Sequence, residues 1–437
     1  MAHPMSATFR DQAAGCLPGS PLYARLLTAM ADDLDAGGVT AAVLAGREGD
    51  RPGTVPPLRL LGGLHLLVLA GQAPELARYY PSAGGTEPPD AAWSAAEPAL
   101  RAHLSDLRRL LGRTVQTNEP GRACLLYGGL LVASQRAAAR SPRATASLAS
   151  AADAPSPASA AAAPSAAGAA GAASPASAAG AASPAGAAGA ASPASAAGAA
   201  GAPSPASAAG AAGAAGAAAG AAGARAMPVR LLEVGASAGL MMLVDRYAYA
   251  VGDRVLGDSA SPLRFEQPWI GAPPADLDVS VEIVQRRGCD PNPIDPSSAE
   301  GRRILLSYVW PDWTERVDRL TTALRLATAP PPVDRAGMAD WLGAQLATPR
   351  PGVLTVVWHS VVRQYIDFPE RDAGQAVLAR AAAAATPEAP LAYLRFEPRR
   401  QPDRSVRFEL LLTCWPGPGQ DELLATAQGH GIPVTWR

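Results

Sequence analysis

The sequence predicts an α/β protein in three parts: an α-helical domain at residues 1–140, a linker at 141–226, and a three-layer α/β/α domain with a mostly parallel sheet at 227–437. Three observations support this division. Apolar residues recur at helical spacing before residue 140, and the middle stretch is almost entirely Ala, Gly, Pro and Ser. After residue 227, short apolar runs alternate with amphipathic stretches, which is typical of βαβ units.

The composition favours a soluble protein with a small-molecule or protein partner. Its 37 basic and 38 acidic residues leave a formal net charge of -1, which predicts no nucleic-acid partner. The four cysteines are scattered without metal or disulfide spacing, so no metal site is expected. No signal peptide is visible, and the longest aliphatic run, residues 58–69, is too short to span a bilayer. We therefore expect a cytoplasmic protein without a membrane partner.

Four amphipathic stretches predict the helical domain. They cover residues 21–34, 58–70, 100–111 and 123–138, and Ser20 is a plausible N-cap for the first. The second stretch is apolar nearly all round, as expected for a helix in the middle of a bundle. His65 interrupts it, and we interpret His65 as a buried structural histidine, with a ligand contact as the alternative.

A cluster of polar residues precedes the last of these stretches. Gln116, Asn118, Glu119 and Arg122 concentrate hydrogen-bond donors and acceptors at a predicted helix start. Asn118 is suited to cap that helix, but the other three exceed what a cap requires. The cluster therefore predicts a contact with substrate, and a purely local role in capping is the alternative.

The segment 141–226 predicts a disordered linker. Units of the type SPASAAGAA recur in it, and Asp153 is the only charged residue between Arg143 and Arg225. Gly and Pro interrupt any helix that the alanines favour, and almost no large apolar side chain is available for a core. We expect the segment to act as a tether, so that its deletion leaves activity intact.

The third part begins with a strand, a turn of small residues and a helix. The apolar run at 229–234 predicts a buried strand that ends at Gly235, and apolar residues at helical spacing follow Gly239. Ser237 is a good N-cap for that helix. Backbone N–H groups and the positive helix end at such a corner can face a ligand, and glycines let the ligand approach closely.

Two chemistries use this corner. Glu233, Gly235, Ser237 and Gly239 spell E-x-G-x-S-x-G, which resembles the first motif of S-adenosylmethionine-dependent methyltransferases. The same residues spell the G-x-S-x-G elbow of α/β-hydrolases, in which Ser237 would be the nucleophile. A third interpretation is that the small residues serve close packing alone.

Strands and helices alternate through the rest of the chain. Strands are predicted at residues 249–256 as a hairpin, 262–265, 279–284, 353–358, 391–396, 406–414 and 433–436. Helices are predicted at residues 301–308, 314–326, 338–346, 373–385 and 421–429. In a parallel sheet, ligands bind at the carboxyl ends of the strands. Asp290, His359 and Glu397 fall at such ends, as does the glycine corner.

Several segments also resemble a bacterial family catalogued as domain of unknown function 2332. They are RLLGGLHLLVLAG, QTNEPGRA, LLEVGASAGL, RRGCDPNPID, WPDWTERVDRL, VVWHSVVRQYI and GHGIPVTW. The resemblance runs through both halves and omits the Ala/Gly/Pro/Ser segment. It implies no activity.

A Rossmann-like, methyltransferase-like domain that uses S-adenosylmethionine on a small molecule is our first hypothesis. Gly235 and Gly239 would let the cofactor pass, Glu233 and Ser237 would support it, and Asp258 or Asp290 would hold its ribose. The residues predicted at the acceptor are His359 as base, with Tyr365 and Gln364 beside it. A ligand-binding module without catalysis is the first alternative, and a serine hydrolase at Ser237 with His359 or His430 as base is the second.

Overall fold

A computed structural model describes residues 2–49, 55–113, 115–141 and 225–437. Apart from residues 141, 225 and 226, the predicted linker at 141–226 lies outside the described residues. Among the residues described, no helix is both long and apolar enough to cross a membrane.

The N-terminal region is helical, as predicted. Its elements are α1 (Ser6–Cys16), α2 (Pro21–Asp35), α3 (Val39–Leu44), α4 (Pro56–Leu69), α5 (Pro74–Ala77), η2 (Pro81–Ala83), η3 (Pro89–Ala91), α6 (Ala92–Ala102) and α7 (Leu104–Leu110). The Ser20 side chain accepts the backbone N–H of Tyr23, which confirms the predicted cap of α2. The apolar faces of these helices form a core of their own.

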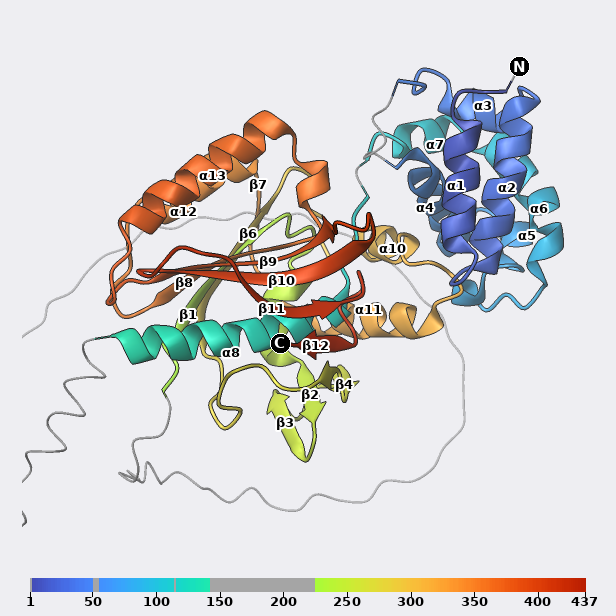
Figure 1. The fold of residues 1–437 in the computed structure, drawn as a ribbon. Coiled ribbons are helices and arrows are strands. Elements are labelled where there is room, and N and C mark those ends of the chain that lie inside the picture. The colour runs from blue at the N-terminus through green and yellow to red at the C-terminus, as the bar shows by residue number, and fades with distance from the viewer. Residues whose placement is uncertain (1, 50–54, 114, 142–224) are drawn as a thin grey trace, which may run out of the picture. The chain divides into compact units, whose positions relative to one another are not determined.

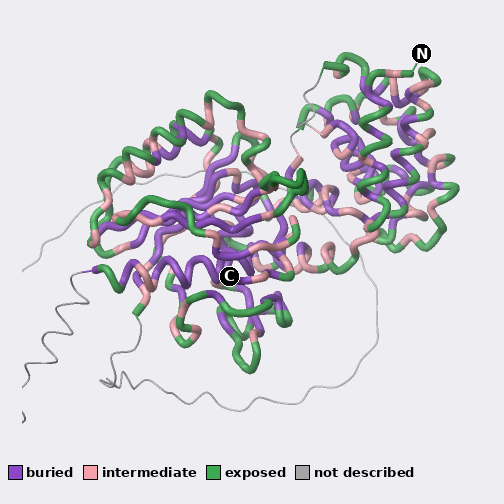
Figure 2. The backbone as a smooth tube through the Cα atoms, in the orientation of Figure 1, coloured by how far each residue is buried: buried purple, intermediate pink, exposed green. Residues whose placement is uncertain are grey.

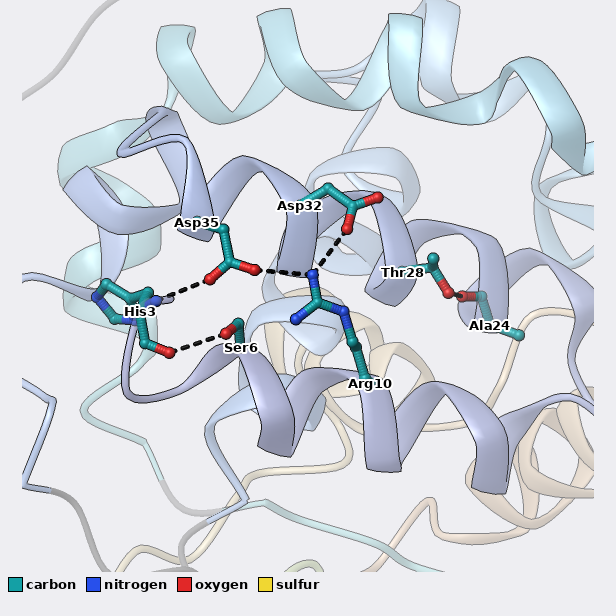
Figure 3. Close-up of polar contacts among 7 residues, drawn as sticks. All are labelled: His3, Ser6, Arg10, Ala24, Thr28, Asp32 and Asp35. Carbon is teal, nitrogen blue, oxygen red and sulfur yellow. Dashed lines mark hydrogen bonds and ion pairs between the residues drawn. The ribbon is translucent and has the colours of Figure 1, made fainter. Parts of the chain in front are cut away.

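Polar contacts on the surface tie α1 to α2 (Figure 3). The Arg10 guanidinium donates to Asp32 and to Asp35, at 2.8 Å in each case. Asp35 also accepts the backbone N–H of His3 at 2.7 Å, and the Ser6 hydroxyl donates to the His3 carbonyl at 2.8 Å. The hydrogen bonds from Arg10 and His3 lower the pKa of Asp35 to about 2. The start of α1 is therefore held against the end of α2.

The last helix before residue 141 packs on the sheet that follows. A short turn, η4 (Pro120–Arg122), leads into α8 (Ala123–Arg140), whose buried side chains join the core of the large sheet. Gly128 and Gly129 permit this contact, because a Cβ there would lie 2.2 Å from the Trp436 ring and 2.6 Å from Leu394, respectively. In Figure 1, α8 runs along one face of the sheet.

The described residues of the C-terminal part form a nine-stranded sheet in the order β5-β12-β11-β10-β9-β8-β1-β6-β7. These strands are β1 (Val229–Val234), β5 (Trp269–Ile270), β6 (Ile283–Asp290), β7 (Val333–Arg335), β8 (Leu354–Ser360), β9 (Leu391–Arg400), β10 (Val406–Trp415), β11 (Glu422–Ala427) and β12 (Val434–Trp436). The run from β7 to β9 is parallel, and the pairs from β9 through β12 are antiparallel. The predicted mostly parallel sheet is confirmed.

Helices cover both faces of this sheet (Figure 1). One face carries α12 (Met338–Leu346) and α13 (Phe368–Ala383), and the other carries α8 with α10 (Ala299–Ser307) and α11 (Thr314–Leu326). The strands between the helices are largely buried (Figure 2). A separate three-stranded sheet consists of β2 (Ala248–Val251), β3 (Arg254–Gly257) and β4 (Arg264–Glu266), and the β2–β3 pair confirms the predicted hairpin.

Two predicted elements were wrong. The stretch 421–429 was predicted as a helix, but Glu422–Ala427 form strand β11, because pairing with β10 and β12 overrides the helix propensity of Leu and Ala. The strand expected at 279–284 is β6, which starts at Ile283 and continues to Asp290. Its two arginines fit inside a strand because Arg286 pairs with Asp245 and Arg287 with Asp334.

The prediction of an α-helix after the glycine turn was also wrong, because the residues there form a different type of helix. Residues Leu240–Arg246 form 3₁₀ turns with a kink at Leu243, and Ser237 caps no helix. Side chains take the carbonyls that an α-helix would use: the Tyr247 hydroxyl donates to Leu240 O at 2.6 Å, and Arg286 donates to Met242 O at 2.7 Å. The corner therefore lacks the N-terminus of an α-helix.

Candidate active site

The predicted glycine corner follows β1, which lies in the interior of the sheet between β6 and β8. Gly235, Ser237 and Gly239 have positive φ angles of 71°, 53° and 73°. The loop is held by Asp290 at the end of β6, whose carboxylate accepts the backbone N–H of Ser237 at 3.0 Å and that of Asn292 at 2.8 Å. Asp290 therefore uses its oxygens to fix the loop.

Side chains fill the space beside both glycines. A Cβ on Gly235 would lie 2.3 Å from Val362 Cγ2, and one on Gly239 would lie 3.0 Å from Met242 Cε and 3.2 Å from Val333 Cγ2. The glycines thus permit close packing of these side chains. The Val362 side chain therefore occupies the space next to Gly235 that the sequence assigned to a cofactor.

Two buried polar atoms of this corner, Glu233 Oε2 and Ser237 Oγ, have no hydrogen-bond partner among the described residues. The buried Nδ2 of Asn118 likewise has none. Burial raises the pKa of Glu233 well above its usual value, and the nearby charge of Asp290 raises it further. Both effects favour the protonated form of Glu233. Since Ser237 Oγ contacts no base, the geometry of an activated serine nucleophile is not formed.

The polar cluster before α8 reaches the same edge of the sheet. The Gln116 amide donates to Asp290 at 3.5 Å, and the Arg122 guanidinium donates to the carbonyl of Ser360, at the end of β8, at 3.4 Å. Glu119 is 3% exposed and pairs with Arg316 of α11 at 2.5 Å. These buried side chains connect the segment 116–122 to the C-terminal half. The sequence had predicted that the same side chains contact substrate.

Three other predicted residues form no hydrogen bond with this network among the described residues. Asp258 is exposed on the small sheet, and its carboxylate accepts the backbone N–H of Ala260 at 3.0 Å. Tyr365, in η6 (Arg363–Tyr365), is partly buried, which raises its pKa, while the charge of Arg122 lowers it. Gln364 is exposed next to it.

His359 is the centre of a buried hydrogen-bonded chain at the carboxyl end of β8. Its Nδ1 lies 2.7 Å from Glu397 Oε1, and its Nε2 lies 2.7 Å from the Tyr393 hydroxyl. The Gln375 amide donates to the same hydroxyl at 3.1 Å from α13. His359 is 4% exposed, so each of its nitrogens depends on these partners.

The Glu397 carboxylate determines which atom donates and which accepts in the two hydrogen bonds of His359. Burial alone would raise the pKa of Glu397, but hydrogen bonds from His359 and from the backbone N–H groups of Val362 and Arg363 lower it. An ionised Glu397 accepts Nδ1–H, which leaves Nε2 as the acceptor of the Tyr393 hydroxyl proton. Burial raises the pKa of Tyr393, so the phenol is protonated at neutral pH.

This chain forms part of the wall of a pocket of about 430 Å³ on the α13 side of the sheet. Besides His359 and Tyr393, its lining consists of Met338, Arg363, Ile366, Arg371, Gln375, Leu378, Ala379, Arg395, Thr413, Trp415, Gly419 and Asp421. Gln364 and Tyr365, predicted to line the acceptor site, are not part of it. The volume suits a small metabolite.

Sequence reasoning missed the pocket residues contributed by β9 and α13. Tyr393, Arg395 and Glu397 alternate along β9, so they share one face of that strand. This spacing of two was a usable signal, because an apolar strand with three polar residues on one face indicates a polar wall. Among the described residues, no group of three or more His, Cys, Asp or Glu side chains could hold a metal ion.

The comparisons with known proteins point to one family. The family model described as "Uncharacterized protein conserved in bacteria (DUF2332)" matches residues 6–144 and 139–436, which confirms the resemblance seen in the sequence. No curated protein and no solved structure matches the chain.

Proposed function

The chain belongs to the DUF2332 family of bacterial proteins, and we propose that it is an enzyme that transfers a proton to or from a small molecule held in the pocket beside Tyr393. The observation that carries this proposal is the buried chain Glu397–His359–Tyr393. A carboxylate, an imidazole and a hydroxyl in this order form the arrangement in which a histidine activates an O–H group.

Each of the hydrogen-bonded residues has a defined part in the proposed proton transfer. His359 Nε2 takes the proton of the Tyr393 hydroxyl, and the resulting phenolate oxygen takes a proton from the bound molecule. Glu397 stabilises the imidazolium through Nδ1–H. Gln375 holds the phenol oxygen toward His359 by its hydrogen bond. The reverse sequence would return the proton to product.

A turnover experiment tests this proposal. Purified protein is incubated with a bacterial metabolite extract, and mass spectrometry follows which compounds are consumed. We expect Tyr393→Phe to slow that consumption about 10²- to 10⁴-fold, because general acid–base catalysis contributes a factor of this size. Tyr79→Phe, in the helical region, is the matched control and should be unaffected. Equal rates for Tyr393→Phe and wild type, or no consumption at all, would contradict the proposal.

A second candidate, a Rossmann-like methyltransferase, is favoured by the order of the parallel strands. In order along the chain they are β1, β6, β7, β8 and β9, and in space they run β7-β6-β1-β8-β9. The order reverses between β1 and β8, which is the topological switch point of doubly wound folds. The glycine loop follows β1 at this point. Glu233 Oε2 and Ser237 Oγ have no hydrogen-bond partner among the described residues and are available to a ligand. His359 would then act on a methyl acceptor in the pocket.

Calorimetry with S-adenosylhomocysteine tests this candidate. Because the Val362 side chain occupies the space beside Gly235, we expect Val362→Ala to bind the ligand more tightly than wild type does. Val406→Ala, which truncates an exposed valine on β10, is the control. Absence of heat in wild type and in Val362→Ala at millimolar ligand would eliminate this candidate. Binding without turnover would instead support a ligand-binding module.

A further inference from the structure

We propose that the ligand of the pocket beside His359 is a small molecule with two negative charges, such as a phosphate ester or a dicarboxylate, bound by Arg363 and Arg371. This inference rests on the proposed function only in that it concerns the same pocket. It adds the chemical class of the ligand and two residues that the sequence did not single out.

The charges in the pocket wall do not cancel. Arg395 forms an ion pair with Asp421, the one acidic residue of the described lining, and Asp421 also accepts the Thr413 hydroxyl at 2.7 Å. The Arg395–Asp421 pair is therefore neutral overall. His359 is neutral in the hydrogen-bonded arrangement described above, and its partner Glu397 is not part of the lining. Arg363 and Arg371 remain, and within the described chain neither forms an ion pair with a carboxylate.

The contacts of these two arginines leave their N–H groups available. The Arg371 guanidinium lies 4.4 Å from the centre of the Phe368 ring, which contacts its planar face and leaves the N–H edge open. Arg363 is exposed, and its backbone N–H donates to Glu397 at 3.3 Å, which does not engage its guanidinium. A guanidinium presents N–H donors in a planar fork that matches carboxylate and phosphate oxygens.

Two nearby carboxylates accept hydrogen bonds from backbone N–H groups. Asp367 accepts the N–H of Glu370 at 2.9 Å as the N-cap of α13, and Glu370 accepts the N–H of Ala339 at 2.9 Å. These bonds hold both acidic side chains at helix starts instead of at the arginines. An incoming anion therefore meets two guanidinium groups without competition from these two carboxylates.

The other residues of the lining indicate the rest of the ligand. Met338, Ile366, Leu378 and Trp415 contribute apolar side chains to it. A short carbon skeleton can contact them while its anionic groups bind the arginines. Tyr393, the proposed proton-transfer group, lines the same pocket.

Calorimetric titration tests the proposal with named probes. Inorganic phosphate, glycerol phosphate and glutarate are titrated into the full chain, Arg363→Gln and Arg371→Gln. We expect each substitution to weaken binding about 10- to 100-fold, which corresponds to the loss of hydrogen bonds to a charged group. Arg380→Gln is the matched control, because Arg380 lies on the same helix but lines a different pocket.

Every outcome of the titration is informative. Preference for glycerol phosphate assigns the site to phosphate esters, and preference for glutarate assigns it to dicarboxylates. No binding of any probe by wild type, or an equal loss in Arg380→Gln, would overturn the inference. Tyr393→Phe should bind the anion normally. Normal anion binding without turnover would therefore refute the proton-transfer proposal and leave the anion site standing.

Discussion

His65 illustrates how a single buried side chain is fixed in one protonation state. Its Nδ1 lies 3.1 Å from the Ser307 carbonyl, which can only accept, and its Nε2 lies 2.7 Å from the Ser82 hydroxyl. The neutral ring with the proton on Nδ1 satisfies both partners. The predicted structural role of this histidine agrees with these contacts, and Ser307 of α10 makes it a link between α4 and the C-terminal half.

This environment predicts a loss of stability in acid. Burial lowers the pKa of His65 from 6.5 to about 4. The unfolded chain therefore binds a proton below pH 6.5 while the folded chain does not, and stability falls by roughly 3 kcal/mol between pH 6.5 and pH 4. Denaturant unfolding at both pH values checks this. His65→Gln should show a drop smaller by that amount, and an unchanged drop would refute the assignment.

The glycine corner shows what single residues could and could not predict. The end of β1 at Val234 and the turn at Gly235 were evident from the sequence, because an apolar run stops at a small residue. The reason for Gly235 was not evident. The side chain that fills its space belongs to Val362, in the loop after β8, and no local pattern indicates a contact between segments so far apart in the chain.

At the level of elements, α8 was predicted as a helix, but its packing partner was not. Its apolar residues have helical spacing, which is a local property. That they face the sheet depends on Gly128 and Gly129, which bring the helix backbone against Trp436 and Leu394. The strand β11 shows the converse case, in which pairing with neighbours decides the structure against local propensity.

Two glycine substitutions in helices test this account of α8. Gly128→Ala should destabilise the fold by about 1–3 kcal/mol, because the added methyl group overlaps the Trp436 ring. Gly15→Ala is the matched control: Gly15 lies in α1 with nothing within 4 Å of the new Cβ, so we expect a gain of about 0.5–1 kcal/mol. Unfolding midpoints in urea measure both. Equal effects of the two substitutions would show that α8 does not pack on β12 as described.

On the scale of the whole molecule, the sequence predicted which edge of the sheet carries the site. It did not predict which side chains pair with one another there. Parallel strands place their carboxyl ends together, so Asp290, His359 and Glu397 were expected at one edge. The segment 116–122 was predicted to contact substrate because its polar residues exceed what a cap requires, but its place at this edge was not predicted. Ion pairs such as Glu119–Arg316 depend on how the helical region packs against α11. The pattern of a single sequence does not predict that packing.

The large sheet is bounded by short strands, Trp269–Ile270 at one side and Val333–Arg335 at the other. Short borders offer few free backbone groups to a second sheet, and Asp334 places a charge on one of them. Joining of two copies through these borders into a continuous sheet or a fibril is therefore disfavoured.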